Sequence, residues 1–233
     1  QASPSDCVRQ IALWLYAGGS SAFLQDANSI IMRTPELIEV LRSLKAHFPS
    51  LSRITSYCRS KTAAKKGMNE FKEMKEAGLT RIHVGMESGA DPVLEFMEKG
   101  MTGEDHIKGG LNIKNAGIEL SEYYMPGLGG RDMSEQHARN TARVLNAINP
   151  DYIRSRPFRP IPGTPMYDQY RAGTLTLQTP EELVGAMGFG ALDAEAMQVV
   201  AERVGGACGR TVLFDLSDGS VRVRDSHDNE EIL

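Results

Sequence analysis

The amino-acid sequence predicts an α/β protein built on a parallel sheet that forms a partial or complete barrel. The first observation is a recurring unit: in 75–85 (KEAGLTRIHVG) and 114–124 (KNAGIELSEYY), a helical pattern ends at Ala-Gly and an aliphatic strand pattern follows. The second observation is that the segments between predicted strands are amphipathic with the helical period. Helices that alternate with strands in this way are the usual connections of a parallel sheet.

The predicted strands and helices follow in order along the chain. Gly78 and Gly117 stand where a left-handed residue ends a helix. Thr34-Pro35-Glu36 predicts a helix start, and an apolar stripe follows it. The strands are expected at 21–25, 51–57, 80–85, 118–125 and 151–156. The helical stripes are Leu37, Val40, Leu41, Leu44 and Phe48; Met68, Phe71 and Met74; Ile107, Leu111 and Ala116; and Thr141, Val144, Leu145 and Ile148.

The two ends of the chain differ from this repeat. The chain opens on a helical pattern, so a first strand is expected to be missing before it, and the absence of an initiator Met indicates a fragment or a processed form. After about residue 180, small residues and Gly dominate, and Asp218-Gly219 predicts the turn of an antiparallel hairpin. We therefore expect a partial barrel over 1–182 and a small C-terminal extension with a hairpin over 183–233.

Composition limits the classes of function. The 233 residues are 41% hydrophobic and 24% charged, with a net charge of −4, which is ordinary for a globular protein. There is no long basic run, so nucleic acid gives no clear signal as a partner. No apolar run is long enough to span a bilayer, and the start does not resemble a secretory signal. A cytoplasmic location is expected.

Polar residues recur where the predicted strands end. Taken singly, each has a structural explanation: Asp26 and Asn28 could form an Asx-turn, and Glu87 could pair with Arg59. Together they predict a concave polar mouth, because ligands of parallel α/β sheets bind at the carboxyl ends of the strands. The turn at 126–130 (PGLGG) would let the backbone approach a ligand closely. The strand-end residues are Gln25, Asp26 and Asn28; Tyr57, Arg59 and Lys61; Glu87 and Ser88; Glu122 and Tyr124; and Arg154, Arg156 and Arg159.

Cysteine and histidine do not predict a metal centre. The three cysteines, Cys7, Cys58 and Cys208, are widely spaced and lie in no CxxC cluster, which indicates a reducing compartment and buried apolar roles. The histidines show no HxxxH or HxH spacing, and no Ser-His-Asp order or GxSxG motif is visible. His83 alternates with apolar Ile82 and Val84 and is expected to face away from them.

Three long runs resemble a known family. Residues 23–62 (FLQDANS to CRSKT), 71–130 (FKEMKEAGLTRIHVGMESGADPVLEFMEKGMT to PGLGG) and 148–167 (INPDYIRSRPFRPIPGTPMY) are similar to the core of radical S-adenosylmethionine (radical SAM) enzymes. The resemblance covers about residues 5–182, with GMESGADPVLEFMEKGMT and PGTPMY as its most specific segments. It is closest to the subgroup of coproporphyrinogen dehydrogenases and tRNA-modifying enzymes.

The resemblance implies a partial (β/α)6 TIM-like barrel with S-adenosylmethionine across its mouth. FLQDANS would meet the methionine amino group, Glu87 the ribose hydroxyls and Arg59 the methionine carboxylate, and Arg156-Pro157-Phe158 would lie along the adenine. An ionised carboxylate is a well-matched acceptor for two vicinal hydroxyls. The candidate cofactor-binding residues are Asp26, Asn28, Arg59, Glu87, Ser88, Glu122 and Arg156.

One departure from the family concerns its iron–sulfur cluster. Family members hold a [4Fe–4S] cluster on a CxxxCxxC loop after the first strand, and this sequence has no such loop. The first hypothesis is a radical SAM enzyme, or most of one, which with its cluster and an electron donor such as a flavodoxin or ferredoxin forms a 5′-deoxyadenosyl radical for hydrogen abstraction from an unknown substrate. The chain as it stands would be inactive.

Two other hypotheses remain. One is a cluster-less SAM- or nucleotide-binding module without redox activity. The other is a barrel lyase or aldolase, ranked last because Lys61 lies beyond its strand and no strand-end lysine stands out for a Schiff base.

Overall fold

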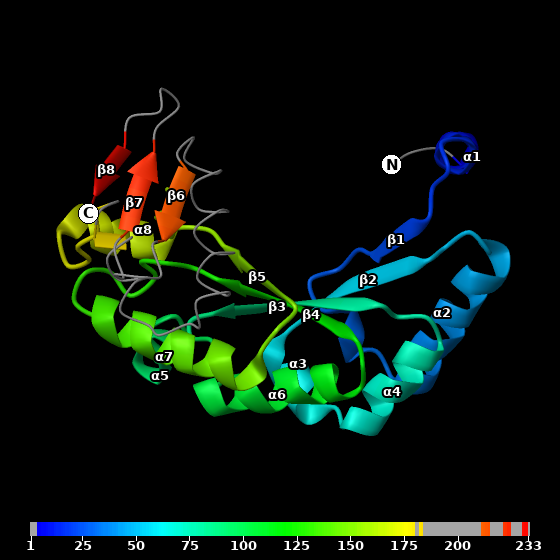
Figure 1. Ribbon diagram of the computed structural model, residues 1–233, viewed down its shortest axis with the longest axis horizontal. Helices are drawn as coiled ribbons and strands as arrows, with labels where there is room; N and C mark the ends of the chain where they lie inside the picture. The colour runs from blue at the N-terminus through cyan, green and yellow to red at the C-terminus, as the bar shows by residue number, and fades with distance from the viewer. Residues whose placement is uncertain (1–3, 180–181, 184–210, 215–220, 225–229, 233) are drawn as a thin grey trace.

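A computed structural model of the chain describes residues 4–179, 182–183, 211–214, 221–224 and 230–232. Its centre is a five-stranded parallel sheet in the order β1-β2-β3-β4-β5, and a three-stranded antiparallel sheet, β6-β7-β8, lies nearer the C-terminus (Figure 1). Sequence order equals spatial order in the parallel sheet, as in a half-barrel. The strands are β1 Ser21–Leu24, β2 Arg53–Cys58, β3 Arg81–Glu87, β4 Glu119–Tyr124, β5 Tyr152–Ser155, β6 Thr211–Phe214, β7 Val221–Arg224 and β8 Glu230–Ile232.

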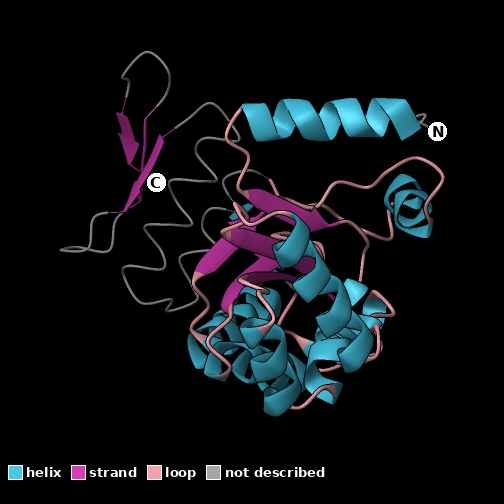
Figure 2. Cartoon of the chain, turned by 90° about the vertical axis from the view of Figure 1, so that its right-hand side faces the viewer, coloured by secondary structure: helices cyan, strands magenta, loops and turns pink. Residues whose placement is uncertain are grey.

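The helices between the strands cover one face of the parallel sheet. Helices α2 to α7 lie on that side, and the opposite face is concave and open between α1 and α8 (Figure 1). Figure 2 shows the helices gathered beneath the sheet, with α1 on the other side of it. The helices are α1 Pro4–Tyr16, α2 Thr34–His47, α3 Ser60–Lys65, α4 Met68–Glu76, α5 Asp91–Phe96, α6 Gly103–Asn115, α7 Ser134–Ile148 and α8 Pro165–Ala172, with a 3-10 turn, η1, at Ser29–Ile31.

The hydrophobic core fills the layer between the sheet and these helices. Alternate residues of β3, namely Ile82, Val84 and Met86, point into it and are fully or almost fully buried. Phe71 of α4 and Ile148 of α7 meet them from the helix side. Because side chains alternate across a strand, the residues between, such as His83 and Glu87, are left for the concave face.

The predicted α/β partial barrel is confirmed, and each predicted strand lies within two residues of an observed one. Gly78 and Gly117 have φ of +116° and +77°, as their place at helix ends predicted. Ala90 is the N-cap of α5, and the Asp91 carboxylate accepts a hydrogen bond from the Gly103 N–H of α6.

Two predicted apolar stripes are partly wrong. Val40 of α2 is 38% exposed, because Leu37 and Leu41 supply the buried side of that helix. Helix α6 buries Gly103, His106, Gly109, Gly110 and Ile113, whereas Leu111 is half-buried. In the C-terminal part, β6 and β7 pair antiparallel, and the predicted turn at Asp218-Gly219 lies outside the described residues. Among the described helices, none has the length and apolar character needed to span a membrane.

Candidate functional site

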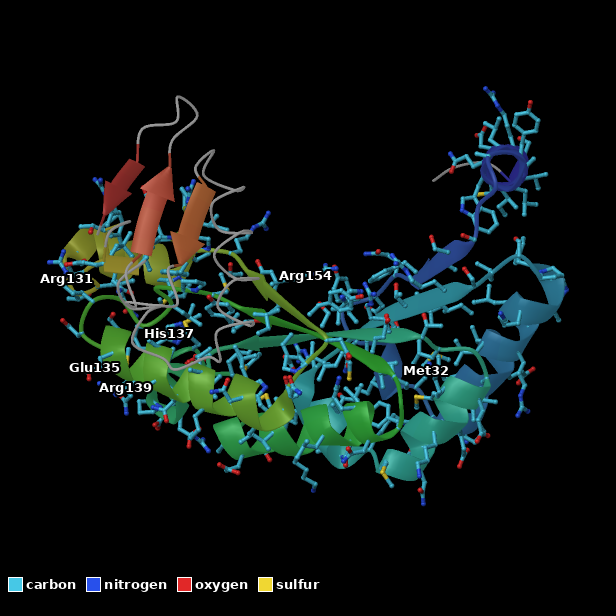
Figure 3. The ribbon with its side chains drawn as sticks, viewed as in Figure 1. Met32, Arg131, Glu135, His137, Arg139 and Arg154 are labelled. Carbon is cyan, nitrogen blue, oxygen red and sulfur yellow. The ribbon has the colours of Figure 1, made fainter. Side chains whose placement is uncertain are left out.

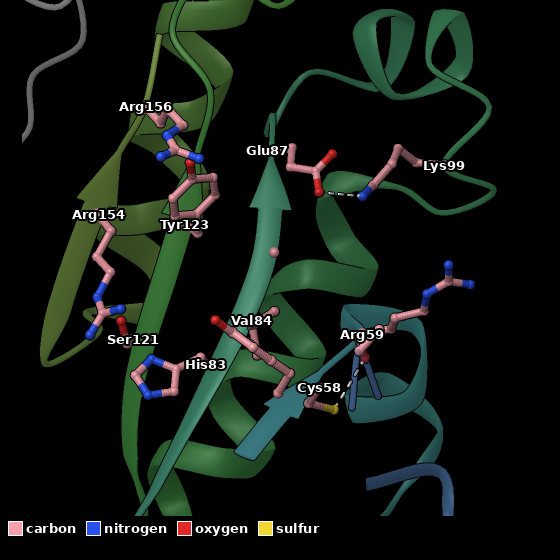
Figure 4. A pocket seen from close by; sticks show the side chains of 13 residues that line it. Cys58, Arg59, His83, Val84, Glu87, Lys99, Ser121, Tyr123, Arg154 and Arg156 are labelled. Carbon is pink, nitrogen blue, oxygen red and sulfur yellow. Dashed lines mark hydrogen bonds and ion pairs between the residues drawn. The ribbon is translucent and has the colours of Figure 1, made fainter. Parts of the chain in front are cut away.

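A pocket of about 500 Å³ opens on the concave face at the carboxyl ends of β2 to β5 (Figure 4). Most of the residues that line it have polar side chains, among them four cationic groups and one carboxylate. It is the position at which parallel α/β folds bind ligands. The lining residues are Ala27, Tyr57, Cys58, Arg59, His83, Val84, Gly85, Glu87, Lys99, Ser121, Tyr123, Arg154 and Arg156.

Glu87 is the carboxylate of this pocket, and its backbone is unusual. It ends β3 directly after a register shift against β4, and its φ of +64° is in the left-handed region. Non-glycine residues seldom adopt that conformation unless the surroundings enforce it. The Glu87 carbonyl accepts from Met125 N at 3.0 Å, and Oε1 lies 2.8 Å from Lys99 Nζ (Figure 4). The bulge and the ion pair together aim the carboxylate into the mouth.

Ser88 lies behind the pocket and is fully buried. His137 of α7 has two hydrogen bonds: Nε2 to the Met125 carbonyl at 3.0 Å and Nδ1 to Ser88 Oγ at 2.8 Å. A carbonyl only accepts, so Nε2 carries the proton and the Ser88 hydroxyl donates to Nδ1. Burial lowers the pKa of His137 to about 4, which keeps the ring neutral. Ser88 therefore fixes the loop that presents Glu87 and does not line the pocket.

The end of β1 is tied to the end of β2 by Asn28. Its Oδ1 accepts from Arg59 N at 2.9 Å, and its Nδ2 donates to Thr62 Oγ1 at 3.0 Å. Asp26 is exposed, and its Oδ1 accepts from Ala27 N at 2.7 Å. Of this loop, Ala27 lines the pocket, whereas Asp26 and Asn28 are beside it. Asn28 thus holds Arg59, which does line the pocket.

Glu122 is not brought to the pocket. It lies in the middle of β4, opposite Val84 and Ile153, and shares their side of the sheet, against the helices. The side chain is 1% exposed, and neither carboxylate oxygen has a hydrogen-bond partner. Burial raises the pKa of this carboxyl to about 8. Its expected place at the mouth with Asp26 and Glu87 is therefore wrong, because strand alternation turns it toward the core.

The arginines divide into two groups around β3. Arg154 and Arg156 lie on the side of β4 and β5, with Arg156 beside Tyr123, whereas Arg59 and Lys99 lie on the other side (Figure 4). The suggested pair between Glu87 and Arg59 is not formed, because Lys99 takes that carboxylate. Figure 3 shows Arg154 on the concave side of the sheet and His137 among the helices beneath.

Eight pocket residues were not among the candidates from sequence: Ala27, Cys58, His83, Val84, Gly85, Lys99, Ser121 and Tyr123. A sequence signal existed for three of them: His83 alternates with the apolar Ile82 and Val84, and Ser121 and Tyr123 follow the same kind of alternation. Ile118 and Leu120 share their parity with Glu122 and mark the buried side of β4, so Ser121 and Tyr123 belong to the opposite face. Lys99 comes from the turn after α5 and has no such signal.

A second hollow, of about 440 Å³, lies beyond the ends of β4 and β5 and is mainly apolar. Phe158 contributes to it and also packs on the buried cluster of Ala90, Val93 and Leu128. The glycine-rich turn does not face an open site: a Cβ on Gly127 would meet Leu183, and one on Gly130 would meet Leu175. These glycines allow contact with 175–183 and not with the pocket.

The described residues do not offer an iron–sulfur site. No three Cys, His, Asp or Glu side chains in that part of the chain converge as metal ligands. Cys7 is exposed on α1, and Cys208 lies outside the described residues. Cys58 is buried, and desolvation raises the pKa of its thiol to about 12. Cluster ligation requires thiolates, so Cys58 is poorly suited to that role.

Comparison with known proteins gives similarities in sequence and in fold. No protein-family model matches the chain. It is 29% identical over 124 residues to a tRNA uridine(34) acetyltransferase of Methanocaldococcus jannaschii. The aligned residues make up 53% of this chain and 23% of the relative. It is 33% identical over 113 residues to a tRNA-2-methylthio-N(6)-dimethylallyladenosine synthase of Alkalilimnicola ehrlichii. Here the aligned residues make up 48% of this chain and 23% of the relative. The matched part is therefore about a quarter of each curated relative.

Solved structures share the fold over most of the chain. Elp3 of Methanocaldococcus infernus gives a TM-score of 0.58 at 17% identity, covering 78% of this chain and 47% of that one. Coproporphyrinogen III oxidase (HemN) of Escherichia coli, described as a radical SAM enzyme, gives 0.56 at 13% identity, covering 82% and 41%. The radical S-adenosylmethionine methyltransferase TsrM of Kitasatospora setae gives 0.53 at 20% identity, covering 71% and 33%. These similarities confirm that the chain has a partial-barrel fold, which it shares with these solved structures.

Proposed function

We propose that the pocket at the ends of β2 to β5 binds S-adenosylmethionine. The observation that carries this proposal is Glu87, held in a left-handed conformation so that its carboxylate enters the pocket at the end of a central strand. In a fold shared with proteins that are described as radical SAM enzymes, a carboxylate at this place suits the two ribose hydroxyls, which are donors for an ionised acceptor.

The pocket has the size and the charges that this cofactor needs. Its volume of about 500 Å³ is within the usual range for small-molecule sites. Arg59 lines the pocket and offers a guanidinium for a carboxylate, the group at the methionine end of the cofactor. Lys99 occupies Glu87 Oε1, which leaves Oε2 for a hydroxyl donor. When bound, S-adenosylmethionine supplies an activated sulfonium, and this chain's residues bind and orient it.

The test of cofactor binding is calorimetry with S-adenosylmethionine on the wild type and on Glu87→Gln. We expect the variant to bind about 1–3 kcal/mol more weakly, because a charge-assisted hydrogen bond becomes a neutral one. Glu95→Gln is a matched control, since Glu95 is exposed on α5 and outside the pocket. Equal affinities for wild type and Glu87→Gln would show that Glu87 has only a structural role.

Redox chemistry is a separate proposal that concerns a longer protein. Reductive cleavage to a 5′-deoxyadenosyl radical needs a cluster, and the described residues supply no set of thiolates for one. We therefore propose cofactor binding without redox activity for the 233-residue chain, and radical chemistry only for a protein that adds the cysteine loop. Anaerobic reconstitution of this chain with iron and sulfide should give no visible iron–thiolate absorbance and no 5′-deoxyadenosine. The appearance of both would show that its cysteines meet.

A further inference from the structure

The concave face carries a second group of side chains, on the amino-terminal side of Glu87. Three rings from adjacent strands meet there: Phe23 of β1, Tyr57 of β2 and His83 of β3. The ring centroids are 4.8 Å apart for Phe23 and Tyr57, 5.9 Å for Phe23 and His83, and 5.8 Å for Tyr57 and His83. Phe23 is 39% and Tyr57 42% exposed. A cluster of aromatic rings with open faces on a concave surface offers a stacking platform.

This platform lies in a positively charged environment. Burial is the main reason that the pKa of His83 is lowered to about 4, and the charges of Arg154, Arg81 and Arg53 lower it further. Arg81 is used internally, since it pairs with Glu119 at 2.8 Å and lies over the ring of Tyr152 at 3.9 Å. Within the described part of the chain, no carboxylate lies within ion-pair distance of Arg53 or Arg154. Among the described residues, Arg53 and Arg154 therefore carry positive charge that no ion pair neutralises.

Two polar atoms beside the platform also have no partner. His83 and Ser121 are opposite each other on β3 and β4, line the pocket, and are 9% and 1% exposed. Neither His83 Nδ1 nor Ser121 Oγ forms a hydrogen bond. Buried polar atoms are normally satisfied, so this pair indicates a ligand group that completes them. Figure 4 shows Arg154 next to both residues.

We propose that this part of the concave face binds a flat ring that carries an anionic group, with the ring against Phe23 and Tyr57 and the anion at Arg154. Carboxylate and phosphate share the required chemistry, since both accept two parallel hydrogen bonds from a guanidinium. Arg53 adds attraction at longer range. The inference rests on the proposed function in one respect: a ligand bound here would lie beside S-adenosylmethionine and would be the substrate that reacts with it.

The test uses phenyl phosphate as the probe. Inorganic phosphate, which has only the anion, and phenol, which has only the ring, are the comparison compounds. Calorimetry on the wild type should show tighter binding of phenyl phosphate than of either comparison compound. Arg154→Gln should weaken phenyl phosphate about tenfold or more, and Phe23→Ala about fivefold. Arg42→Gln, an exposed position on α2, is the matched charge control and should leave the affinity unchanged.

A parallel titration with S-adenosylmethionine separates this inference from the proposed function. Phe23 does not line the pocket near Glu87, so Phe23→Ala should bind the cofactor as the wild type does. Phenyl phosphate binding with the expected pattern, but no cofactor binding, would overturn the proposed function and leave the second site standing. Equal affinity of phenyl phosphate for wild type, Arg154→Gln and Phe23→Ala would overturn the second site, whatever the cofactor does.

Discussion

At the scale of single residues, the strained backbone of Glu87 depends on the buried contact behind it. Ser88 Oγ donates to His137 Nδ1 and accepts from Ala90 N at 3.0 Å. Ser88→Ala would leave both partners unsatisfied in a dry environment, so we expect a loss of about 1–3 kcal/mol in the free energy of unfolding. Cofactor affinity should fall severalfold as the loop relaxes. Urea unfolding and calorimetry measure the two effects.

The control for this prediction is Ser43→Ala on the exposed side of α2, which should change stability by less than about 0.5 kcal/mol. If Ser88→Ala matches the control in stability and affinity, the buried contact does not hold Glu87 in place.

The candidate site was predictable from sequence where a strand simply ends. Arg59, Glu87 and Arg156 are at such ends, and all three line the pocket. Ser88 was misplaced because it follows Ile82, Val84 and Met86 with the same parity and is therefore turned toward the helices, where it is fully buried. Glu122 was misplaced because residue type was given more weight than alternation.

At the scale of elements, helix α6 packs between α3 and α7 through two glycines. A Cβ on Gly109 would lie 3.0 Å from Ala63 Cβ, and one on Gly110 would lie 2.7 Å from Ile148 Cγ2. The sequence predicted the helix but not these contacts, because glycine in a helix costs about 1 kcal/mol relative to alanine and is usually read as a weakness. Here the absence of a side chain allows close packing of the layer that supports the site.

The Gly110→Ala variant tests whether helix propensity or close packing against Ile148 dominates at this position. Helix propensity favours alanine by about 1 kcal/mol, whereas overpacking against Ile148 costs about 1–3 kcal/mol, so we expect a net loss of stability. Ile148→Ala should cost about 2–5 kcal/mol by itself. In the double variant the new methyl group enters the vacated space, so its urea-unfolding free energy should exceed the additive value by about 1 kcal/mol or more. Strict additivity would show that the two residues do not compete for this space.

At the scale of the whole molecule, the two faces of the sheet differ in electrostatic character. The concave face collects cations, among them Arg59, Arg154 and Arg156. The helix face is dry and encloses Glu122 without a partner. The net charge of −4 hides this division, because composition carries no information on which face a residue occupies. Charge segregation follows from strand parity, which becomes known only when the register is fixed.

Buried titratable groups on this scaffold predict a stability maximum near neutral pH. The pKa values of His83, His106 and His137 are lowered to about 4, mainly by burial. Between pH 6.5 and 4 the unfolded chain therefore binds more protons than the folded one, and stability falls as the pH falls. Glu122 acts in the opposite direction: its pKa is raised to about 8, so the folded chain holds the extra proton above pH 4.5, and stability falls as the pH rises toward 8.

Three histidines outweigh one carboxyl below their unfolded pKa, and Glu122 is the main contributor between pH 7 and 8. The free energy of unfolding should therefore peak at about pH 7 and then decline by about 1 kcal/mol per pH unit up to about pH 8. Urea unfolding from pH 5 to 9 measures this profile. Glu122→Gln cannot ionise and should lose the decline between pH 7 and 8, while keeping the acid decline and the decline above pH 8 that follows from the raised pKa of the Cys58 thiol; Glu95→Gln should retain all three. A wild-type stability that keeps rising to pH 9, or an unchanged profile in Glu122→Gln, would mean that Glu122 is ionised in the folded chain, and that water or a cation reaches it between the sheet and the helices.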